Sequence, residues 1–211
     1  MKKIALAFLI ALSSAAAMAG EVYGNIGTEG IGAGYSHSIN GSFNIRGEVN
    51  GLSKSYTQDS DDLTYKGDLK LGGVSILADY FPFASRFRVT AGAIANNGKL
   101  TGTASGNGGT YNINGKNYTY TGSDRITADV KFGNVSPYLG IGTGHTGQKG
   151  FGFFADMGVI FQSPKSTITA SGDLASLIDP ADLEAERRSL QDSVDKFKFY
   201  PVVKAGVSYT F

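Results

Sequence analysis

Apolar and polar residues alternate along most of this chain with a period of two, the pattern that predicts β-strands. Over residues 197–211, the odd-numbered positions from Phe197 to Phe211 are all apolar or aromatic, whereas the even-numbered positions are mostly polar or small. Five other stretches alternate in the same way. We therefore expect six long strands, at residues 43–57, 64–81, 86–100, 128–145, 151–165 and 197–211.

The length of these stretches separates two interpretations of the alternation. Strands of soluble proteins most often have about 5–6 residues, whereas a strand needs about 9–11 residues to cross a bilayer. In a soluble sandwich the apolar face points inward; in a transmembrane β-barrel it meets lipid, and the polar face lines a lumen. The long stretches favour the barrel, and because backbone groups cannot stay unpaired in lipid, the sheet has to close. We expect an all-β fold, a membrane-spanning antiparallel up-and-down β-barrel.

The number of strands depends on residues 21–37. If they form one strand, the total is seven, and the first and last strands would have to pair in parallel. If the chain reverses at Thr28-Glu29-Gly30, they form two short strands and the total is eight. Bacterial single-chain barrels have an even number of strands, which favours eight. Short and long connections also alternate, as expected for such barrels; they fall at 38–42, 58–63, 82–85, 101–127, 146–150 and 166–196.

The first nineteen residues have the features of a secretory signal peptide. Lys2 and Lys3 give a positive start, residues 4–12 are apolar, and Ala17-Met18-Ala19 matches a small-residue cleavage pattern. We expect residues 1–19 to be removed and residues 20–211 to form the barrel, in the outer membrane of a Gram-negative bacterium.

Composition and charge exclude several classes of protein. The 211 residues include no cysteine, which excludes a disulfide scaffold and a thiolate metal site. The net charge of +1 gives no electrostatic case for binding nucleic acid. The chain has 30 glycines, and small residues on the inner face would let a narrow, curved barrel close.

The two longest connections are expected to be external loops. Within 101–127, Asn114-Gly115 predicts a hairpin turn. Within 166–196, Asp179 followed by Pro180 predicts the start of one short helix, on which Glu184 and Arg188 are spaced for an i,i+4 ion pair. We expect this helix to pack on the barrel rim; a lid or a partner site is the alternative.

The polar face of the strands supplies the candidate site residues. In the stretch 64–81 the apolar positions change parity at Gly72-Gly73, which suggests a bulge or bend there. With that slip, Asp79 joins the polar face. The expected lumen-lining residues are Arg46, Glu48, Lys66, Asp68, Lys70, Asp79, Arg88, Asp156 and Lys204.

Three interpretations of this polar face remain open. An eight-stranded barrel is just wide enough for side chains to fill it, so the charges could form a closed plug of ion pairs. They could instead line a narrow path for small zwitterions or cations. A lipid-modifying enzyme is a remote third, since His37 and His145 are the only histidines and no serine is positioned beside them by strand geometry. We expect no catalytic residues, no metal site and no cofactor.

Three segments resemble a family of small proteobacterial outer-membrane proteins: Ser-Pro-Tyr-Leu-Gly-Ile-Gly at 136–142, Gly-Phe-Gly-Phe-Phe-Ala-Asp-Met-Gly at 150–158, and the last thirteen residues, 199–211. They are similar to the CarO-type proteins and, more loosely, to OmpW/OmpA-like eight-stranded barrels. The resemblance implies an eight-stranded outer-membrane barrel. It also implies uptake of ornithine or other basic amino acids and a connection with carbapenem entry, but it marks no substrate residue.

The sequence thus leads to one expected location and to alternative functions. We expect an outer-membrane barrel that serves as a narrow passive channel for small solutes such as basic or zwitterionic amino acids. The alternative is a closed-lumen structural or surface-interaction barrel, either adhesin-like or in contact with lipopolysaccharide. The expected partners are membrane lipid and lipopolysaccharide, a small solute, and the outer-membrane assembly machinery, for which the terminal Phe211 resembles the recognition signal.

Overall fold

The fold was analysed in a computed structural model that describes residues 20–60, 63–82, 85–106, 110–119 and 124–211. The predicted signal peptide, residues 1–19, lies outside the described residues. No helix in the described part of the chain is both long and apolar enough to cross a membrane.

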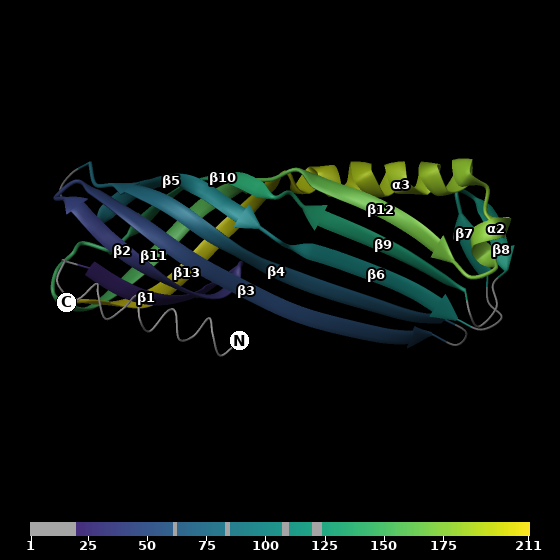
Figure 1. Ribbon diagram of the computed structural model, residues 1–211, viewed down its shortest axis with the longest axis horizontal. Coiled ribbons are helices and arrows are strands. Elements are labelled where there is room, and N and C mark those ends of the chain that lie inside the picture. The colour runs from purple at the N-terminus through teal and green to yellow at the C-terminus, as the bar shows by residue number, and fades with distance from the viewer. Residues whose placement is uncertain (1–19, 61–62, 83–84, 107–109, 120–123) are drawn as a thin grey trace.

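Eight antiparallel strands form a closed ring, as predicted (Figure 1). The ring closes where the first strand pairs with the last, with Glu21 opposite Thr210, and where β4 pairs with β5. Residues 21–37 do supply two strands, which confirms the count of eight. In order around the ring, the strands are β1 (Gly20–Gly27), β2 (Gly30–Asn40), β3 (Phe43–Ser60), β4 (Leu63–Tyr80), β5 (Phe87–Asn96), β10 (Val135–Thr143), β11 (Gly150–Phe161) and β13 (Phe199–Thr210).

The same sheet continues beyond one end of the ring (Figure 1). The far halves of β3 and β4 run beyond the ring, and β4 there pairs with β6 (Lys99–Gly106), which pairs with β9 (Arg125–Phe132) and then with β12 (Pro164–Ser171). We call this part of the sheet, with the segments packed on it, the extension. The other end of the ring carries only short connections and is called the short-turn end.

The extension corrects the prediction of six uninterrupted long strands. The predicted strands 86–100, 128–145 and 151–165 each break into a ring strand and an extension strand. One break is at Gly98, where a Cβ atom would lie 2.8 Å from Asn96 Oδ1 and 3.1 Å from the Phe132 ring. Another is at Gly133, whose φ of 44° favours glycine. Because the chain bends at these points, the far halves leave the ring and continue as an open part of the same sheet.

The predicted bulge at Gly72-Gly73 is absent. The pairing of β3 with β4 runs from Phe43 opposite Tyr80 to Ser60 opposite Leu63 without a register shift. Even-numbered residues of β4 therefore keep to the outer face throughout. That face is apolar on the ring, as at Ile76, and polar on the extension, as at Lys66. The change of parity in the sequence marks a change of surroundings along one straight strand.

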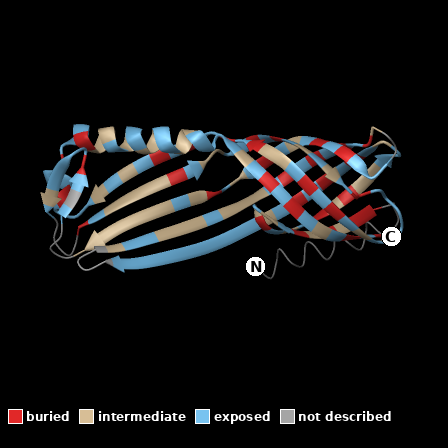
Figure 2. Ribbon diagram, turned by 180° about the vertical axis from the view of Figure 1, so that it is seen from behind, coloured by how far each residue is buried: buried red, intermediate tan, exposed pale blue. Residues whose placement is uncertain are grey.

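The ring is polar inside and apolar outside, as predicted. Figure 2 shows buried and exposed residues alternating along the ring strands, with few buried residues on the extension. On the outer face Phe151 is 86% exposed and Phe153 is 78% exposed, whereas the inward side chains of Arg46 and Asp79 are fully buried. This is the reverse of a soluble protein, and it is the distribution found in barrels that cross a bilayer.

The extension carries a hairpin and helices on one face. The hairpin joins β7 (Thr110–Ile113) to β8 (Lys116–Thr119) through Asn114 and Gly115, both with positive φ, which confirms the predicted turn. The helices are α2 (Leu174–Leu177), α3 (Pro180–Val194) and the 3-10 helix η1 (Asp195–Phe197). Asp179 caps α3 by accepting a hydrogen bond from Ala181 N, as its position before Pro180 predicts.

Helix α3 protects the edge of the extension. Its Gln191 accepts a hydrogen bond from Ser166 N at 2.8 Å and donates one to Pro164 O at 3.0 Å. These are backbone groups of β12, the edge strand, which would otherwise be open to pairing with another chain. At the far end, Ile113, Leu174 and Ile178 form a small buried core with Leu183 of α3 against it. The helix thus packs on the extension, which corrects the prediction that it packs on the barrel rim.

Candidate functional site: the barrel interior

Four charged side chains from four strands meet inside the ring. Arg46 on β3 binds Asp79 on β4 (Nε–Oδ2 2.7 Å) and Asp156 on β11 (Nη1–Oδ2 3.3 Å). Arg88 on β5 binds the same two carboxylates, at 2.5 Å to Asp156 and 3.4 Å to Asp79. Thr90 donates a further hydrogen bond to Asp79. None of the four charged side chains is exposed to solvent.

A second charged group lies beside the first. Lys204 Nζ on β13 is 2.6 Å from Glu48 Oε1 on β3, and 3.8 Å from Glu29 Oε2 in the turn between β1 and β2. Tyr23 and Asn50 also donate to Glu48. Strand alternation explains the placement, because Glu48 follows Arg46 by two residues and therefore points to the same side of β3.

The turn between β10 and β11 folds into the ring at the short-turn end. His145 has a φ of 55° and is fully buried, with its backbone carbonyl accepting from Asn44 Nδ2 at 2.8 Å. Its Nδ1 is 3.0 Å from Glu21 Oε2, and its Nε2 is 3.4 Å from Arg46 Nη1. This geometry suits a neutral imidazole that donates from Nδ1 to Glu21 and accepts at Nε2 from Arg46.

Burial and the nearby positive charges of Arg46 and Arg88 lower the pKa of His145, and Glu21 offsets part of that effect. The imidazole is also packed between aromatic rings, 4.7 Å from Tyr23 and 4.2 Å from Phe154, measured between centroids. The protonated form would place an N–H against the Arg46 guanidinium, so the neutral form is favoured by contact geometry as well as by burial.

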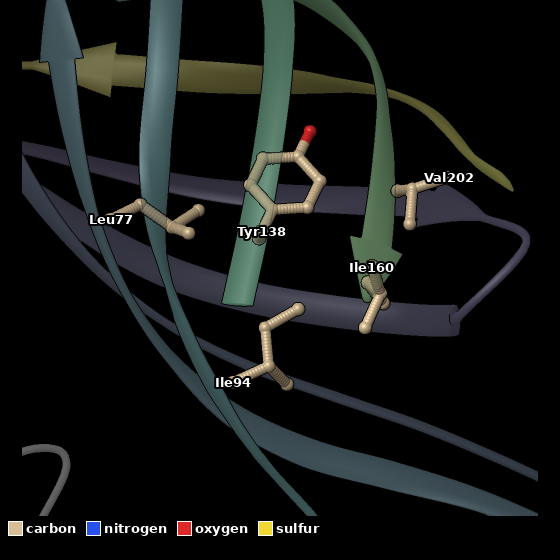
Figure 3. Close-up of a cluster of buried hydrophobic side chains, with 5 residues drawn as sticks. All are labelled: Leu77, Ile94, Tyr138, Ile160 and Val202. Atoms are coloured by element: carbon tan, nitrogen blue, oxygen red, sulfur yellow. The ribbon is translucent and has the colours of Figure 1, made fainter. Parts of the chain in front are cut away.

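An apolar layer lies above the charged groups, toward the extension. Leu77, Ile94, Tyr138, Ile160 and Val202 come from β4, β5, β10, β11 and β13 and point toward one another (Figure 3). Each is at most 4% exposed, and Val202 is fully buried. Tyr200 packs against this layer from the extension side. The interior is therefore closed twice, once by ion pairs and once by apolar side chains.

The hollows around these two layers lie at the ends of the ring. At the extension end a cavity of about 40 Å³ lies among Glu29, Ile94, Ile160 and Tyr200; this is room for about three water molecules. At the short-turn end a polar vestibule of about 380 Å³ ends at His145. Neither volume joins the other through the four fully buried charges.

The structure brings six of the nine predicted lumen residues together inside the ring, namely Arg46, Glu48, Asp79, Arg88, Asp156 and Lys204. It places Lys66, Asp68 and Lys70 elsewhere, on the outer face of the extension. Their alternation with apolar residues predicts that they share the lumen with Asp79 only if the register slips at Gly72-Gly73, and no such slip occurs. Phe211 lies beside the start of β1, with its N–H donating to Gly20 O; its role in assembly stays a prediction.

Several interior residues were missed from the sequence. Glu21 and Tyr23 alternate inward on β1, but this alternation identifies an inward face only once residues 21–37 are known to form two strands. Glu29 and His145 sit in turns, where no periodicity marks the inward side. The apolar layer was missed because inward apolar residues do not stand out in a strand whose outer face is also apolar.

The ring, its apolar outer surface and its closed polar interior define the class: a membrane-spanning eight-stranded β-barrel.

The same fold is found in two crystal structures from Acinetobacter baumannii. CarO shares 22% sequence identity over 90% of this chain and 97% of its own, with a TM-score of 0.58. CarO2 shares 21% identity over 92% of this chain and 99% of its own, with a TM-score of 0.60. The fold expected from the resemblance to CarO-type barrels is thus confirmed. No protein-family model and no curated protein sequence matches the chain.

Proposed function

We propose that this protein is an outer-membrane barrel of a Gram-negative bacterium whose lumen is closed and which acts at the cell surface through its extension. The single observation that carries the closed lumen is the complete burial of Arg46, Asp79, Arg88 and Asp156 across the ring. Opening a path would require breaking ion pairs that have no water to replace them, at several kcal/mol each.

The orientation follows from the two ends of the ring. Barrels of the outer membrane have short turns on the periplasmic side and longer connections outside the cell. The short-turn end therefore faces the periplasm, and the extension with α3 and the β7–β8 hairpin faces the medium. The fold shared with the A. baumannii proteins supports this location.

A narrow channel for small cationic or zwitterionic solutes is the second candidate. It is favoured by the acid excess inside the ring, where the five carboxylates of Glu21, Glu29, Glu48, Asp79 and Asp156 face the three basic groups of Arg46, Arg88 and Lys204. Such an interior would attract cations if water reached it.

Conductance across a planar bilayer separates the two candidates. The closed barrel predicts no current steps from the wild-type protein, while a general porin inserted into the same bilayers gives them. Insertion is checked by protease protection of the ring strands. Steady currents, or uptake of lysine into liposomes, that change in Lys204→Glu or Arg88→Glu would contradict the closed barrel and support the channel.

A further inference from the structure

The outer face of the extension is polar throughout. On the five strands β3, β4, β6, β9 and β12, the residues of this face pair directly with one another, and each is Ser, Thr, Asp, Lys or Arg. The opposite face is the one that packs the small core and α3. Among the described residues, no helix or hairpin covers the polar face, so it is a free surface next to the membrane.

Four lysines stand side by side on this face. Lys70 pairs with Lys99, Lys99 pairs with Lys131, and Lys131 pairs with Lys165, across four neighbouring strands. We call these four residues the lysine row. With neighbouring strands about 4.8 Å apart, the row is about 15 Å wide. Like charges directly opposite each other destabilise a sheet, so this arrangement needs an anion to offset the repulsion.

The chain itself supplies little of that anionic charge. Lys99 Nζ is 2.9 Å from Asp129 Oδ1, and the Asp129 carboxylate also accepts from Thr101. Lys70, Lys131 and Lys165 make no ion pair or hydrogen bond within the described residues. Over the whole face, six basic residues outnumber three acidic ones; they are Lys66, Lys70, Lys99, Arg125, Lys131 and Lys165 against Asp59, Asp68 and Asp129.

The lysines of the row have a constant offset, counted along the chain, from the apolar outer surface of the ring. In each of its four strand lines, the lysine is four residues beyond the last outward apolar residue; these residues are Val74, Ala95, Val135 and Phe161. At about 3.3 Å per residue and a tilt of about 35–45°, each lysine stands about 10 Å above its own outward apolar residue. The headgroup layer on one side of a bilayer is about 5–8 Å thick, and a lysine side chain can extend back into it.

We propose that the lysine row binds the phosphate groups of the outer-leaflet glycolipid, lipopolysaccharide. The row supplies adjacent ammonium groups at headgroup height, and the neighbouring hydroxyls, including those around a hollow of about 350 Å³ lined by Thr103, Ser105 and Thr127, supply hydrogen bonds for the sugars. The outer surface below it holds acyl chains. The inference rests on the proposed outer-membrane location of the barrel.

The test measures how purified lipid A binds to the full-length mature protein in detergent micelles, by native mass spectrometry. The triple variant Lys70→Gln, Lys131→Gln, Lys165→Gln removes the three unpaired members of the row. The control Lys54→Gln, Lys149→Gln, Lys196→Gln removes the same charge from exposed lysines elsewhere. We expect the row variant to bind bisphosphorylated lipid A at least tenfold more weakly than the wild type, and the control to stay within twofold.

A second variant guards against a folding defect in the first. Asp129→Asn removes the carboxylate that competes for Lys99, so it should bind bisphosphorylated lipid A more tightly than the wild type. Equal binding by wild type and row variant, or equal binding of dephosphorylated lipid A, would overturn the proposal. So would inorganic pyrophosphate bound as tightly as the lipid, because the site would then serve a soluble phosphate.

The same samples distinguish failure of the row from failure of the barrel. If the wild-type protein does not insert into lipid vesicles, as judged by protease protection, the proposed membrane location is wrong. The proposal that the lysine row binds a membrane glycolipid then fails with it. If it inserts and the row variant binds lipid A normally, only the lysine row is wrong.

Discussion

At the scale of residues, the interior depends on charges that share partners. Asp156 is bound by both Arg46 and Arg88, and none of the three side chains is exposed to solvent. Breaking a buried pair by removing one partner leaves an uncompensated charge that has no access to water. The same pairs on a surface would matter little, because water and salt screen them.

This contrast gives a prediction about unfolding. Asp156→Asn should lower the free energy of unfolding by about 3–5 kcal/mol, because two arginines lose their shared carboxylate. Asp129→Asn, which removes the partly exposed partner of Lys99, should cost less than about 1 kcal/mol. Urea unfolding of both variants in lipid vesicles measures the difference. Equal costs would mean that the interior is solvated.

His145 gives a prediction about pH. Its pKa lies below the ordinary value because of burial and of Arg46 and Arg88 nearby. The unfolded chain then takes up a proton near pH 6.5 before the folded chain does, so stability should fall as the pH drops below about 6.5. His145→Gln should reduce that slope. Unfolding midpoints between pH 7.5 and 5 test this, and an unchanged slope in the variant would contradict it.

At the scale of elements, a few polar contacts tie the β7–β8 hairpin to α3. Asp182 at the start of α3 accepts hydrogen bonds from Asn114 Nδ2, Lys116 Nζ and Tyr118 Oη of the β7–β8 hairpin, at 2.7–2.9 Å. These donors lower the pKa of Asp182 to about 2. A carboxylate whose pKa is lowered by folding contributes its full stabilisation when the pH is above the ordinary pKa of the group. That contribution is lost as the pH falls toward the lowered pKa.

Two outcomes follow for the hairpin. Asp182→Asn should speed amide hydrogen exchange in residues 110–119 without changing exchange in the ring strands, whereas Asp192→Asn on the same helix should change neither. In the wild type, exchange corrected for its intrinsic pH dependence should rise in the hairpin between about pH 4 and pH 2. Protection that persists in Asp182→Asn would show that the apolar core alone holds the hairpin.

The elements also show how far the sequence could lead. Alternation located the ring strands, and Asn114-Gly115 and Asp179-Pro180 located the hairpin and the helix, because these signals are local. The breaks at Gly98 and Gly133 arise where the predicted long strands divide into ring strands and extension strands. This division depends on the packing of several strands, so no local sequence pattern predicts it. The polarity change at Gly72-Gly73 was visible, but a change of surroundings and a slip in register leave the same pattern in one strand.

At the scale of the whole molecule, one sheet serves two surroundings. Its outer face is apolar where it meets lipid and carries the lysine row where it leaves the lipid. Its inner face is charged within the ring and apolar beneath α3. The full set of inward residues could not be predicted from the sequence without knowing how the ring closes. The reason is that Glu29 and His145 reach the interior from turns.

The closed interior can be tested most directly with cysteine labelling, because the chain has no cysteine of its own. Ser75→Cys and Ser136→Cys place thiols inside the ring, at positions at most 2% exposed, and Ser53→Cys places one on the exposed extension. In lipid nanodiscs, a charged methanethiosulfonate reagent should label the Ser53→Cys variant within minutes and leave the two interior variants unlabelled until the protein is unfolded. Labelling of either interior variant at the rate of Ser53→Cys would reveal a water-filled lumen and contradict the closed barrel.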